Sequence, residues 1–569
     1  MKHSWDELDT YRGEYFSGQW PSIIDMLLIT EGKFPQRPSF TVFKPDRTTL
    51  TFTELVASVR RVGSALAEAG VGRGDRVVIN GKNSPAWGIA YLATLWAGGV
   101  VVPLDNQMDI ERVRHLSEFV EASYLFGDKA IVDALDESHL WCRSLKGCAT
   151  LLGRSDNIPH IDELAPNDEI THAILGEHEL AAILFTSGTT GAEKGVMLTH
   201  ANIISDVYQA CDGMFLSLDE TDVLYALLPL HHSYCCTSVL LESIKHGAEC
   251  VFGQDIIVSR MIADLSRGKV TIFMGIPLLY NKLLSGLLKQ VRKKGRATYA
   301  LIRTMMAVNG VLKKYLHINP FRPLFNKLLL NKVGLDHNHI LICGAGPLSP
   351  KVFKQYQQLG LDFIQGYGLT ETSPILTLNP ISKFKVESVG KVFPLVDMII
   401  ADADENGVGE IRVKGPNVCS GYYRDEASSA DLFDEEGYLR TGDLGYLDRE
   451  EYLYLKGRAK NLIVTEGGKN VYPEQIEDRF QLYAQIDQIL VRSYQEKADV
   501  PAEAIEAVIY PNSEYYEEHQ LPIREDLERI IAEVNQLLPI YEKITRLTIA
   551  EEAMDMTSTK KIKRNKVTI

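Results

Sequence analysis

Residues 186–195, TSGTTGAEKG, combine glycines, hydroxyl side chains and one lysine directly after the apolar run 181–185. Glycine lets backbone N–H groups approach an anion closely, hydroxyl groups donate hydrogen bonds, and lysine adds a positive charge. The segment therefore indicates a phosphate-binding loop at the end of a buried strand. It is not a Walker A loop, because Lys194 is followed by Gly195 and not by Ser or Thr. Taken alone, it is also compatible with an ordinary loop between a strand and a helix.

Further polar segments with glycines follow along the chain. The first two come directly after apolar runs, HILIC and LDFI. Each segment alone could be a turn, but their order and spacing together indicate a shared site. They are CGAGPLS (343–349), QGYGLTETSP (365–374), YLRTGDLGYLD (438–448), GRAKNLIVTEGGKNVYPEQIE (457–477) and TSTKKIKR (557–564).

The elements that must position these segments change in character along the chain. In the first half, short apolar runs alternate with helix-like segments, which predicts parallel sheets of the α/β class. After Gly390, short strands with turn signals predict a small β-rich subdomain at about 390–455, and residues 460–569 have the length and pattern of a compact α+β unit. The apolar runs of the first half are 75–80, 99–104, 181–185 and 271–277.

The composition is that of an ordinary soluble protein with more than one domain. The chain has 569 residues, of which 45% are hydrophobic and 24% charged, so it should divide into two or more domains. Its eight cysteines show no CxxC spacing, which disfavours structural zinc and disulfides and favours the reducing cytoplasm. The charged N-terminus lacks an apolar secretory core. Residues 83–104 are uncharged and long enough to span a bilayer, but Gly98 and Gly99 divide them into a buried helix and a buried strand.

Together, the glycine-punctuated segments resemble the motifs of the AMP-forming adenylate-forming enzymes, the ANL superfamily. This family includes acyl- and aryl-CoA synthetases, adenylation domains of peptide synthetases and luciferases. The resemblance extends from near Leu50 to the lysine motif at 557–564. It implies a large N-terminal domain of parallel α/β subdomains with a small β subdomain, residues 1–459, and a small mobile α+β domain, residues 460–569. It also implies that the protein is an enzyme that uses ATP and Mg²⁺.

The resemblance assigns the first segment to the β- and γ-phosphates of ATP. Glu371 is similar to the magnesium ligand of the family, with help from Thr186, because a hard cation prefers carboxylate and hydroxyl oxygen. The family usually has proline where this chain has Glu193, and we expect this extra carboxylate to point to solvent. The implied phosphate ligands are Thr186, Ser187, Gly188, Thr189, Thr190 and Lys194.

Adenine and ribose contacts are implied by the next motifs. Tyr367 resembles the ring that stacks on adenine, and the glycines on either side of it should leave room for the base. Asp443 matches the aspartate that binds the ribose hydroxyls, and Arg458 resembles its ribose and phosphate partner. The other implied nucleotide ligands are Gly344, Ala345, Gly346, Gly366, Gly368 and Thr370.

The terminal motif implies a catalytic lysine. In TSTKKIKR the family pattern of lysine, aliphatic residue, any residue and arginine selects Lys561 and not its neighbours Lys560 and Lys563. An ammonium group there would stabilise the charge that develops during an in-line displacement at the α-phosphate. The implied catalytic set is Lys561 with Glu371 and Thr186. Lys460 falls on the hinge position between the two domains, where it would absorb backbone rotation.

The acyl pocket is expected around residues 227–244. This region contains no acid before Glu242, which disfavours an α-amino acid substrate, because its ammonium group would need a buried carboxylate. His232 and Tyr234 fall where acyl-CoA synthetases carry pocket residues that position the acyl carboxylate. As a lone histidine, His232 could equally be a satisfied core residue.

A strongly basic stretch suggests which acid is activated. Residues 281–332 contain twelve Lys and Arg and no Asp or Glu, although the whole chain has a net charge of −15. Interleaved with apolar residues, this pattern indicates basic amphipathic helices that suit an anionic membrane surface. A solvated positive face or a polyphosphate dock fits about as well, whereas nucleic acid is disfavoured because no base-stacking or groove-binding motif accompanies it. The insertion at 281–340 and GGKNVYPE (467–474) resemble those of long-chain acyl-CoA synthetases.

The resulting hypothesis is a long-chain fatty acid:CoA ligase that forms an acyl-adenylate and transfers the acyl group to CoA. It would be cytoplasmic, with peripheral contact at the inner face of the membrane if the stretch 281–332 binds lipid. A fatty-acyl–acyl-carrier-protein ligase would share every motif and differ only in its acceptor. A non-catalytic acyl- or nucleotide-binding relative is disfavoured because the implied catalytic residues are all present.

Overall fold

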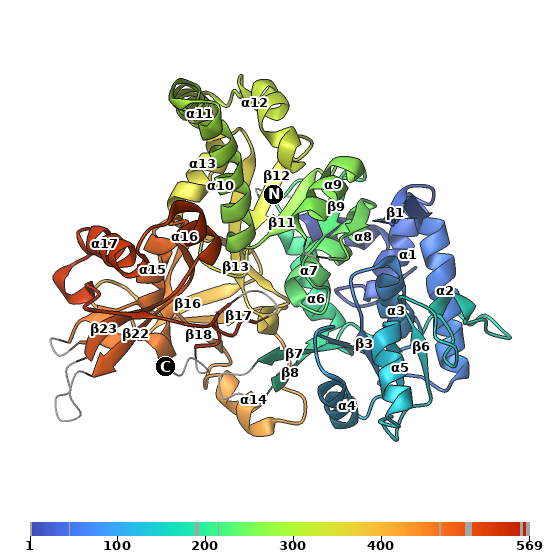
Figure 1. Cartoon of the computed structure of the whole chain (residues 1–569). Helices are drawn as coiled ribbons and strands as arrows, with labels where there is room; N and C mark the ends of the chain where they lie inside the picture. The colour runs from blue at the N-terminus through green and yellow to red at the C-terminus, as the bar shows by residue number, and fades with distance from the viewer. Residues whose placement is uncertain are drawn as a thin grey trace.

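The computed structural model describes residues 3–44, 46–187, 193–213, 215–255, 257–465, 468–495, 503–557 and 561–564. Two large sheets with flanking helices make up most of the molecule, and the C-terminal part lies against one side of them (Figure 1). The predicted α/β class is confirmed.

The first large sheet has six strands in the order β6-β5-β3-β4-β7-β8. Its first five strands are parallel, and β8 pairs antiparallel with β7. The uncharged stretch at 83–104 contributes a buried helix and the fully buried strand β4, as the sequence predicts. The strands are β3 (Arg76–Asn80), β4 (Val100–Leu104), β5 (Tyr124–Gly127), β6 (Gly147–Thr150), β7 (Leu180–Ser187) and β8 (Glu193–Thr199).

The second sheet has thirteen strands in the order β16-β17-β18-β19-β15-β14-β13-β12-β11-β9-β10-β1-β2. The strands from β13 to β1 in this order pair parallel with one another. The six strands on the other side of β13, from β14 to β16 in the sheet order, pair antiparallel. The short strands after Gly390 therefore extend the parallel sheet through β14 and do not form a sheet of their own. The strands are β1 (Pro38–Phe43), β2 (Arg47–Thr51), β9 (Val223–Ala226), β10 (Glu249–Phe252), β11 (Ile272–Gly275), β12 (Ile340–Cys343), β13 (Asp362–Gly368), β14 (Ile375–Leu378), β15 (Gly390–Val392), β16 (Asp397–Ala401), β17 (Gly409–Lys414), β18 (Leu439–Leu447) and β19 (Tyr452–Arg458).

The helices begin where the sequence provides caps. Thr51 and Glu54 form a capping box at the start of α2, whose buried side chains recur at helical spacing. Proline is the first residue of α3, α10 and α13, where its missing N–H is not needed. The helices are α1 (Ile23–Lys33), α2 (Phe52–Glu68), α3 (Pro85–Trp96), α4 (Ile110–Phe119), α5 (Lys129–Glu137), α6 (His200–Ala210), α7 (Ser233–Cys235), α8 (Glu242–His246), α9 (Val258–Gly268), α10 (Pro277–Lys293), α11 (Arg296–Leu316), α12 (Arg322–Leu328), α13 (Pro350–Gln358) and α14 (Glu426–Leu432). None of the helices described reaches the length and apolarity needed to cross a bilayer.

The C-terminal part has a hydrophobic core of its own. The buried members of this core run from Ile463 to Ile544, whereas those of the largest core run from Leu8 to Leu453. Its strands pair in the order β22-β23-β24, and β20 pairs with β21. The elements are β20 (Ile463–Val464), β21 (Asn470–Val471), α15 (Pro473–Glu477), β22 (Ile486–Gln495), β23 (Glu503–Pro511), α16 (Ser513–His519), α17 (Ile523–Asn535) and β24 (Arg546–Ile549).

Candidate active site

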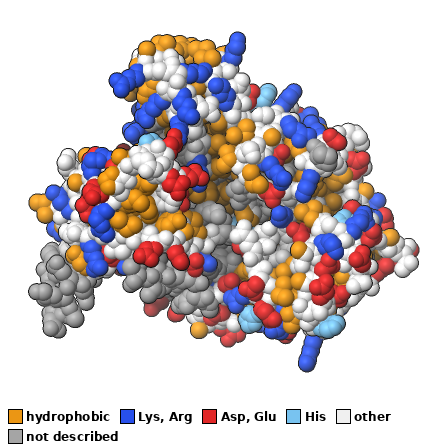
Figure 2. All heavy atoms as spheres, in the orientation of Figure 1, with side chains coloured by type: hydrophobic (Ala, Val, Ile, Leu, Met, Phe, Trp, Pro, Cys, Tyr) orange, Lys and Arg blue, Asp and Glu red, His pale blue; other side chains and the backbone are white. Residues whose placement is uncertain are grey.

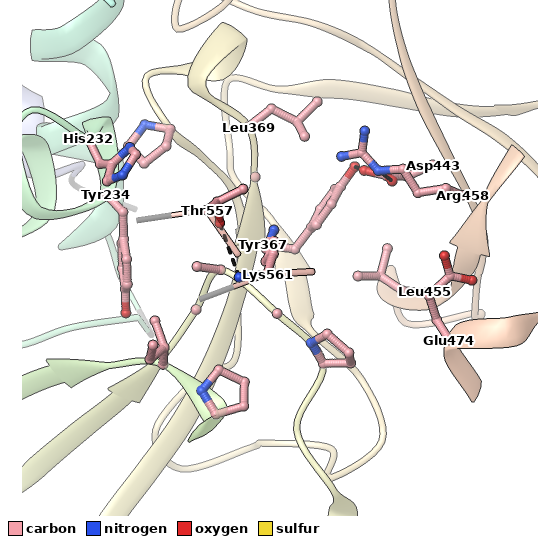
Figure 3. Close-up of a pocket in the computed structure, with 18 of the residues that line it drawn as sticks. His232, Tyr234, Tyr367, Leu369, Asp443, Leu455, Arg458, Glu474, Thr557 and Lys561 are labelled. Carbon is pink, nitrogen blue, oxygen red and sulfur yellow. Dashed lines mark hydrogen bonds and ion pairs between the residues drawn. The ribbon is translucent and has the colours of Figure 1, made fainter. Parts of the chain in front are cut away.

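One cleft of about 1830 Å³ brings together residues from both parts of the chain. The loops after β12 and β13, the strands β18 and β19 and the C-terminal tail all contribute to its lining (Figure 3). Ser187 belongs to β7 but its side chain is not described, and Gly188, Thr189 and Thr190 lie outside the described residues. The predicted residues that line the cleft are Thr186, Lys194, His232, Tyr234, Gly344, Ala345, Gly346, Gly366, Tyr367, Gly368, Thr370, Glu371, Asp443, Arg458, Lys460 and Lys561.

The hairpin of β7 and β8 presents a hydroxyl group and an ammonium group together. Thr186 and Lys194 are directly opposite each other in the antiparallel register. The Nζ atom of Lys194 lies 4.8 Å from the ring centre of Tyr422, and the hydroxyl of Tyr422 donates a 2.9 Å hydrogen bond to Oε1 of Glu371. Hydroxyl and carboxylate oxygens facing one cleft are the donors that Mg²⁺ prefers, so Thr186 and Glu371 fit a magnesium site. Tyr422 was not predicted, and no local motif marks it.

Glu193 does not point to solvent, and this expectation was wrong. Both Nε and Nη2 of Arg112, from α4, donate to one carboxylate oxygen of Glu193, at 3.0 and 2.7 Å. The Glu193 side chain is only 20% exposed. The guanidinium therefore neutralises the carboxylate that replaces the usual proline, close to the place where phosphates are expected.

Asp443 is held between two partners on neighbouring strands. Arg458 lies opposite it in the β18–β19 register and binds its Oδ1 atom through Nε at 2.8 Å. The hydroxyl of Tyr367 donates to Oδ2 at 2.7 Å (Figure 3). Burial raises the pKa of Asp443, and Arg458 opposes this shift. Burial is the largest single influence on the pKa of Arg458 and would lower it, but the neighbours Asp443, Tyr367, Glu371 and Glu474 together raise the pKa above its ordinary value. The cluster thus fixes the ring of Tyr367 and keeps a charged pair at the cleft wall.

The glycines of the cleft have packing reasons in addition to any role toward adenine. A Cβ atom on Gly368 would lie 1.7 Å from the carbonyl oxygen of Pro374, so no other residue fits there. A Cβ atom on Gly344 would lie 2.9 Å from the ring of Tyr234. The space that Gly366 leaves is limited by Thr377, whose carbonyl oxygen would lie 3.1 Å from an added Cβ. Room for a base beside Tyr367 stays a prediction.

Lys561 enters the cleft between the acyl and nucleotide residues (Figure 3). Its backbone N–H donates to the hydroxyl of Thr557 at 3.1 Å. Its charge affects the pKa of His232 on one side and of Asp443 on the other, so it is close to both. Although the residue as a whole is exposed, burial of its ammonium group among the cleft walls lowers the pKa of Lys561, with a further contribution from Arg458.

Arg564, the last residue of the lysine motif, anchors this segment. Its Nη2 atom donates to both carboxylate oxygens of Glu477, each at 2.6 Å, and its Nη1 atom donates to the carbonyl of Val491 at 2.9 Å. Burial raises the pKa of Glu477, and Arg564 opposes this shift. The motif pattern contains this arginine, but only the structure shows its partner.

The histidines at the acyl end are neutral. Burial lowers the pKa of His232 to about 3, with help from the adjacent His231, and lowers the pKa of His231 to about 4. Their ring centres are 4.2 Å apart. A neutral imidazole can donate or accept a hydrogen bond without adding charge to the site. The Tyr234 ring packs against Gly344, as described above, and lines the same wall.

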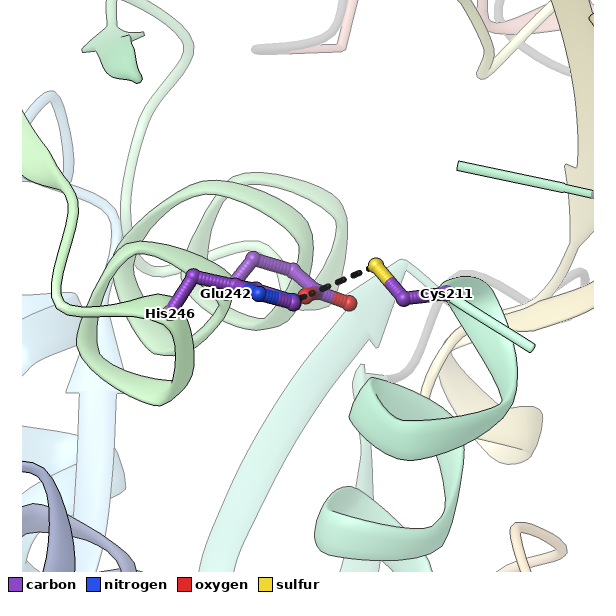
Figure 4. A group of neighbouring side chains, drawn as sticks. All are labelled: Cys211, Glu242 and His246. Carbon is purple, nitrogen blue, oxygen red and sulfur yellow. Dashed lines mark hydrogen bonds and ion pairs between the residues drawn. The ribbon is translucent and has the colours of Figure 1, made fainter. Parts of the chain in front are cut away.

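A buried polar group lies near the same region, formed by Cys211, Glu242 and His246 (Figure 4). The thiol donates to Oε2 of Glu242 at 3.8 Å, and Nε2 of His246 lies 3.4 Å from the same oxygen. Three such side chains could hold a metal ion, but the ammonium of Lys245 is 3.4 Å from Nε2 of His246. This ammonium lies beside a candidate ligand nitrogen and over the ring of Tyr208, 4.5 Å from the ring centre, so its charge would repel an added metal cation.

Comparisons with known proteins agree with this geometry. A family described as "AMP-binding enzyme" matches residues 30–423, more than half of the chain. Long-chain-fatty-acid–CoA ligase FadD15 from Mycobacterium bovis is 29% identical over 481 residues, 78% of this chain and 75% of that protein. Long-chain-fatty-acid–CoA ligase ACSBG2 from Mus musculus is 28% identical over 458 residues, 75% of this chain and 68% of that protein.

Solved structures support the fold. The anthranilate CoA ligase AuaEII in complex with anthranoyl-AMP superimposes with a TM-score of 0.77 at 18% identity, over 96% of each chain. ATP-bound MatB from Rhodopseudomonas palustris gives a TM-score of 0.74 at 23% identity, over 95% of this chain and 97% of that one. The predicted family, fold and enzyme class, an AMP-forming ligase, are confirmed. The protein belongs to the AMP-binding enzymes, the AMP-forming adenylate-forming family.

Proposed function

We propose that the protein is a long-chain fatty acid:CoA ligase. ATP and a fatty acid give an acyl-adenylate and pyrophosphate, and the thiol of CoA then displaces AMP to give acyl-CoA. The observation that carries this proposal is the position of Lys561 in the cleft, between His232 on the acyl side and the pair of Asp443 and Arg458 on the other. A single ammonium there can contact both the acyl carboxylate and the α-phosphate, and no protein nucleophile is required.

The other cleft residues have roles that follow from their chemistry. Lys194 and Thr186 would bind the β- and γ-phosphates, and Glu371 with Thr186 would hold Mg²⁺, which neutralises phosphate charge when bound. Asp443 would accept hydrogen bonds from the ribose hydroxyls. The neutral His232 would orient the acyl carboxylate without repelling Lys561.

The long-chain preference and the acceptor are the finer parts of the proposal. Relatives named long-chain-fatty-acid–CoA ligases cover most of the chain, including one from Bacillus subtilis that is 26% identical over 82% of this chain and 81% of its own. Apolar side chains such as Leu216, Met274 and Ile276 line part of the cleft and suit a hydrocarbon tail. A carrier protein would be a competing acceptor. Peripheral membrane contact through 281–332 belongs to the same proposal and is developed below.

We also propose that residues 460–569 move as a lid about Lys460. The separate hydrophobic core of this part supports a unit that can rotate intact. Lys460 is exposed in the short turn that follows β19. Because Lys561 is carried by this unit, rotation would withdraw it from the cleft after adenylation and leave room for CoA.

The test is pyrophosphate release with ATP and Mg²⁺ across acids from acetate to oleate, with and without CoA. The variant is Lys561→Ala, and the matched control is Lys543→Ala, which removes a lysine of the same C-terminal part that does not line the cleft. CoA-dependent turnover that is highest on long-chain acids and is lost in Lys561→Ala alone would support the proposal. Adenylate that CoA cannot discharge would favour a carrier-protein acceptor, and the same activity in Lys561→Ala as in wild type would refute the assigned role.

A further inference from the structure

Helix α11 has an inward face and a separate, exposed apolar face. One packs inward through Ile302, Met306 and Asn309, which are buried. The other is exposed: Leu301 is 60% and Val311 57% solvent-accessible. At 3.6 residues per turn these two sets point in clearly different directions, so the exposed apolar stripe is not part of the core-facing stripe.

The exposed face of α11 lacks the charges that a solvated helix normally carries. Between 297 and 311 its exposed positions hold only alanine, leucine, threonine and valine. The apolar patch continues through the end of α11 and onto α12, and hydrophobic side chains gather at the top of the molecule over these two helices (Figures 1 and 2). Its large exposed side chains are Leu301, Val308, Val311, Tyr315, Leu316, Ile318, Leu324 and Leu328. We call this set the α11–α12 surface.

Cations flank the α11–α12 surface. Lys293, Lys294 and Arg296 are exposed where α10 passes into α11, and Lys314 and Lys327 are exposed farther along. Figure 2 shows Lys and Arg side chains around the hydrophobic patch at the top of the molecule. No Asp or Glu occurs between 281 and 332, so no acid of this segment compensates these charges. An apolar patch with a basic rim matches an anionic bilayer, whose headgroups attract the cations and whose interior accepts the apolar side chains.

Helix α10 connects this surface to the cleft. Its first half lines the cleft through Leu278, Asn281, Lys282 and Ser285, and its end leads directly into α11. A fatty acid partitions into bilayers, so an enzyme that acts on it benefits from a membrane next to its acyl site. A free polyphosphate ligand would use the cations but would not account for the uncharged apolar face between them.

We propose that the α11–α12 surface is a docking site for anionic lipid bilayers. Its purpose, access to membrane-dissolved fatty acid, rests on the proposed function, but the docking itself does not. The apolar side chains enter the boundary between headgroups and acyl chains, and the basic residues at the start of α11 contact the lipid phosphates. The helices lie on the membrane and do not span it.

The test is co-sedimentation of the full-length protein with phosphatidylcholine vesicles, with and without phosphatidylglycerol. We expect binding that requires phosphatidylglycerol and weakens as salt is added. In Lys293→Gln/Lys294→Gln/Arg296→Gln, the partition coefficient should fall about hundredfold, since each cation near the surface contributes about fivefold. In Leu301→Asp/Val311→Asp it should fall at least tenfold, because the apolar contacts are lost.

A matched control is Leu537→Asp/Ile540→Asp. Leu537 and Ile540 are 67% and 87% exposed and lie in the C-terminal part, away from the proposed surface. This variant should bind vesicles like wild type. Activity on water-soluble octanoate without vesicles, measured for all variants, shows that each is folded and separates loss of docking from failure of the ligase proposal.

Three outcomes would overturn the docking proposal. The first is wild-type protein that does not bind anionic vesicles. The second is binding that the control variant loses as much as the Leu301→Asp/Val311→Asp variant does. The third is a wild-type dimer that this apolar variant dissociates while vesicle binding is unchanged, which would assign the surface to a second copy of the chain.

Discussion

Replacement of Arg564 by methionine should slow adenylate formation and spare thioester formation. Arg564 makes two charge-assisted hydrogen bonds to Glu477 and one to the carbonyl of Val491, and the two charged side chains are 26% and 18% exposed. These bonds hold the end of the segment that carries Lys561 into the cleft. Because the guanidinium of Arg564 is engaged by Glu477 and the carbonyl of Val491, we expect its role to be positioning.

The size of the effect follows from these contacts. A hydrogen bond to a charged group contributes about 1.5–3 kcal/mol. The segment keeps its other ties, which include the hydrogen bonds between Thr557 and Lys561 and the one from the Lys563 N–H to the carbonyl of Asp555. A loss of about 3 kcal/mol from the free energy that holds this segment in place corresponds to roughly a hundredfold lower occupancy of the cleft by Lys561. Adenylate formation in single-turnover experiments should therefore fall about hundredfold. The transfer of the acyl group from supplied acyl-adenylate to CoA should change by less than about threefold, because Lys561 is expected to leave the cleft in that step.

Two controls separate positioning from general damage. Arg546→Met removes a different arginine–glutamate pair of the same C-terminal part, which lies outside the cleft, and should leave both half-reactions unchanged. Glu477→Gln should reproduce much of the Arg564→Met defect, and the double variant should be little worse than either single variant. Equal loss of both half-reactions in Arg564→Met, or no loss of adenylation, would refute this reasoning.

Three further outcomes follow from the structure. Arg112→Gln leaves the Glu193 carboxylate unpaired near the expected phosphates, so the KM for ATP should rise about tenfold. A second change, Glu193→Gln, should return the KM to the wild-type value, and an unchanged KM in Arg112→Gln would contradict the role of this ion pair. Because the pKa of Lys561 is lowered from its ordinary 10.5, the rate of adenylation should decline as the pH rises through a value below 10.5. In Lys561→Arg this decline should occur at a higher pH, and a pH profile identical to that of wild type would contradict the role of Lys561. Burial lowers the pKa of His200 from 6.5 to about 4. As the pH falls, the imidazole therefore becomes protonated in the unfolded chain before it does in the folded chain. Stability should be full above pH 6.5 and fall by about 3 kcal/mol as pH drops toward 4, and urea unfolding of His200→Asn should show a smaller loss than wild type.

The nucleotide side of the cleft could be predicted because its residues sit in short segments directly after strands. In a sheet with parallel strands, ligands bind beyond the carboxyl ends of the strands, so segments that follow β12 and β13 had to meet. The segments 343–349 and 365–374 were noted because they follow apolar runs, whereas the roles of Gly344 and Tyr367 were implied by the resemblance. The resemblance then supplied roles for Asp443 and Lys561 that residue types alone could not assign.

Long-range pairing could not be predicted. Glu193 and Arg112 are 81 residues apart, and Arg564 and Glu477 are 87 residues apart, so no local pattern links the partners. A carboxylate needs either water or a partner of opposite charge, and the sequence does not show which of the two the fold provides. The expectation that Glu193 points to solvent failed for this reason. The strands after Gly390 were expected from their turns, but their attachment to the parallel sheet through β14 is a property of the whole topology.

Two polar contacts that join the C-terminal part to the rest are compatible with the proposed rotation of the lid. Gln481 bonds to the backbone of Ser349 at 2.9 Å and of Pro347 at 3.0 Å, and each such bond contributes about 1 kcal/mol. Lys289 on α10 pairs with Glu518 at 3.1 Å, but both side chains are exposed, and such pairs contribute about 0–1 kcal/mol. These contacts are weak enough to break in each turnover.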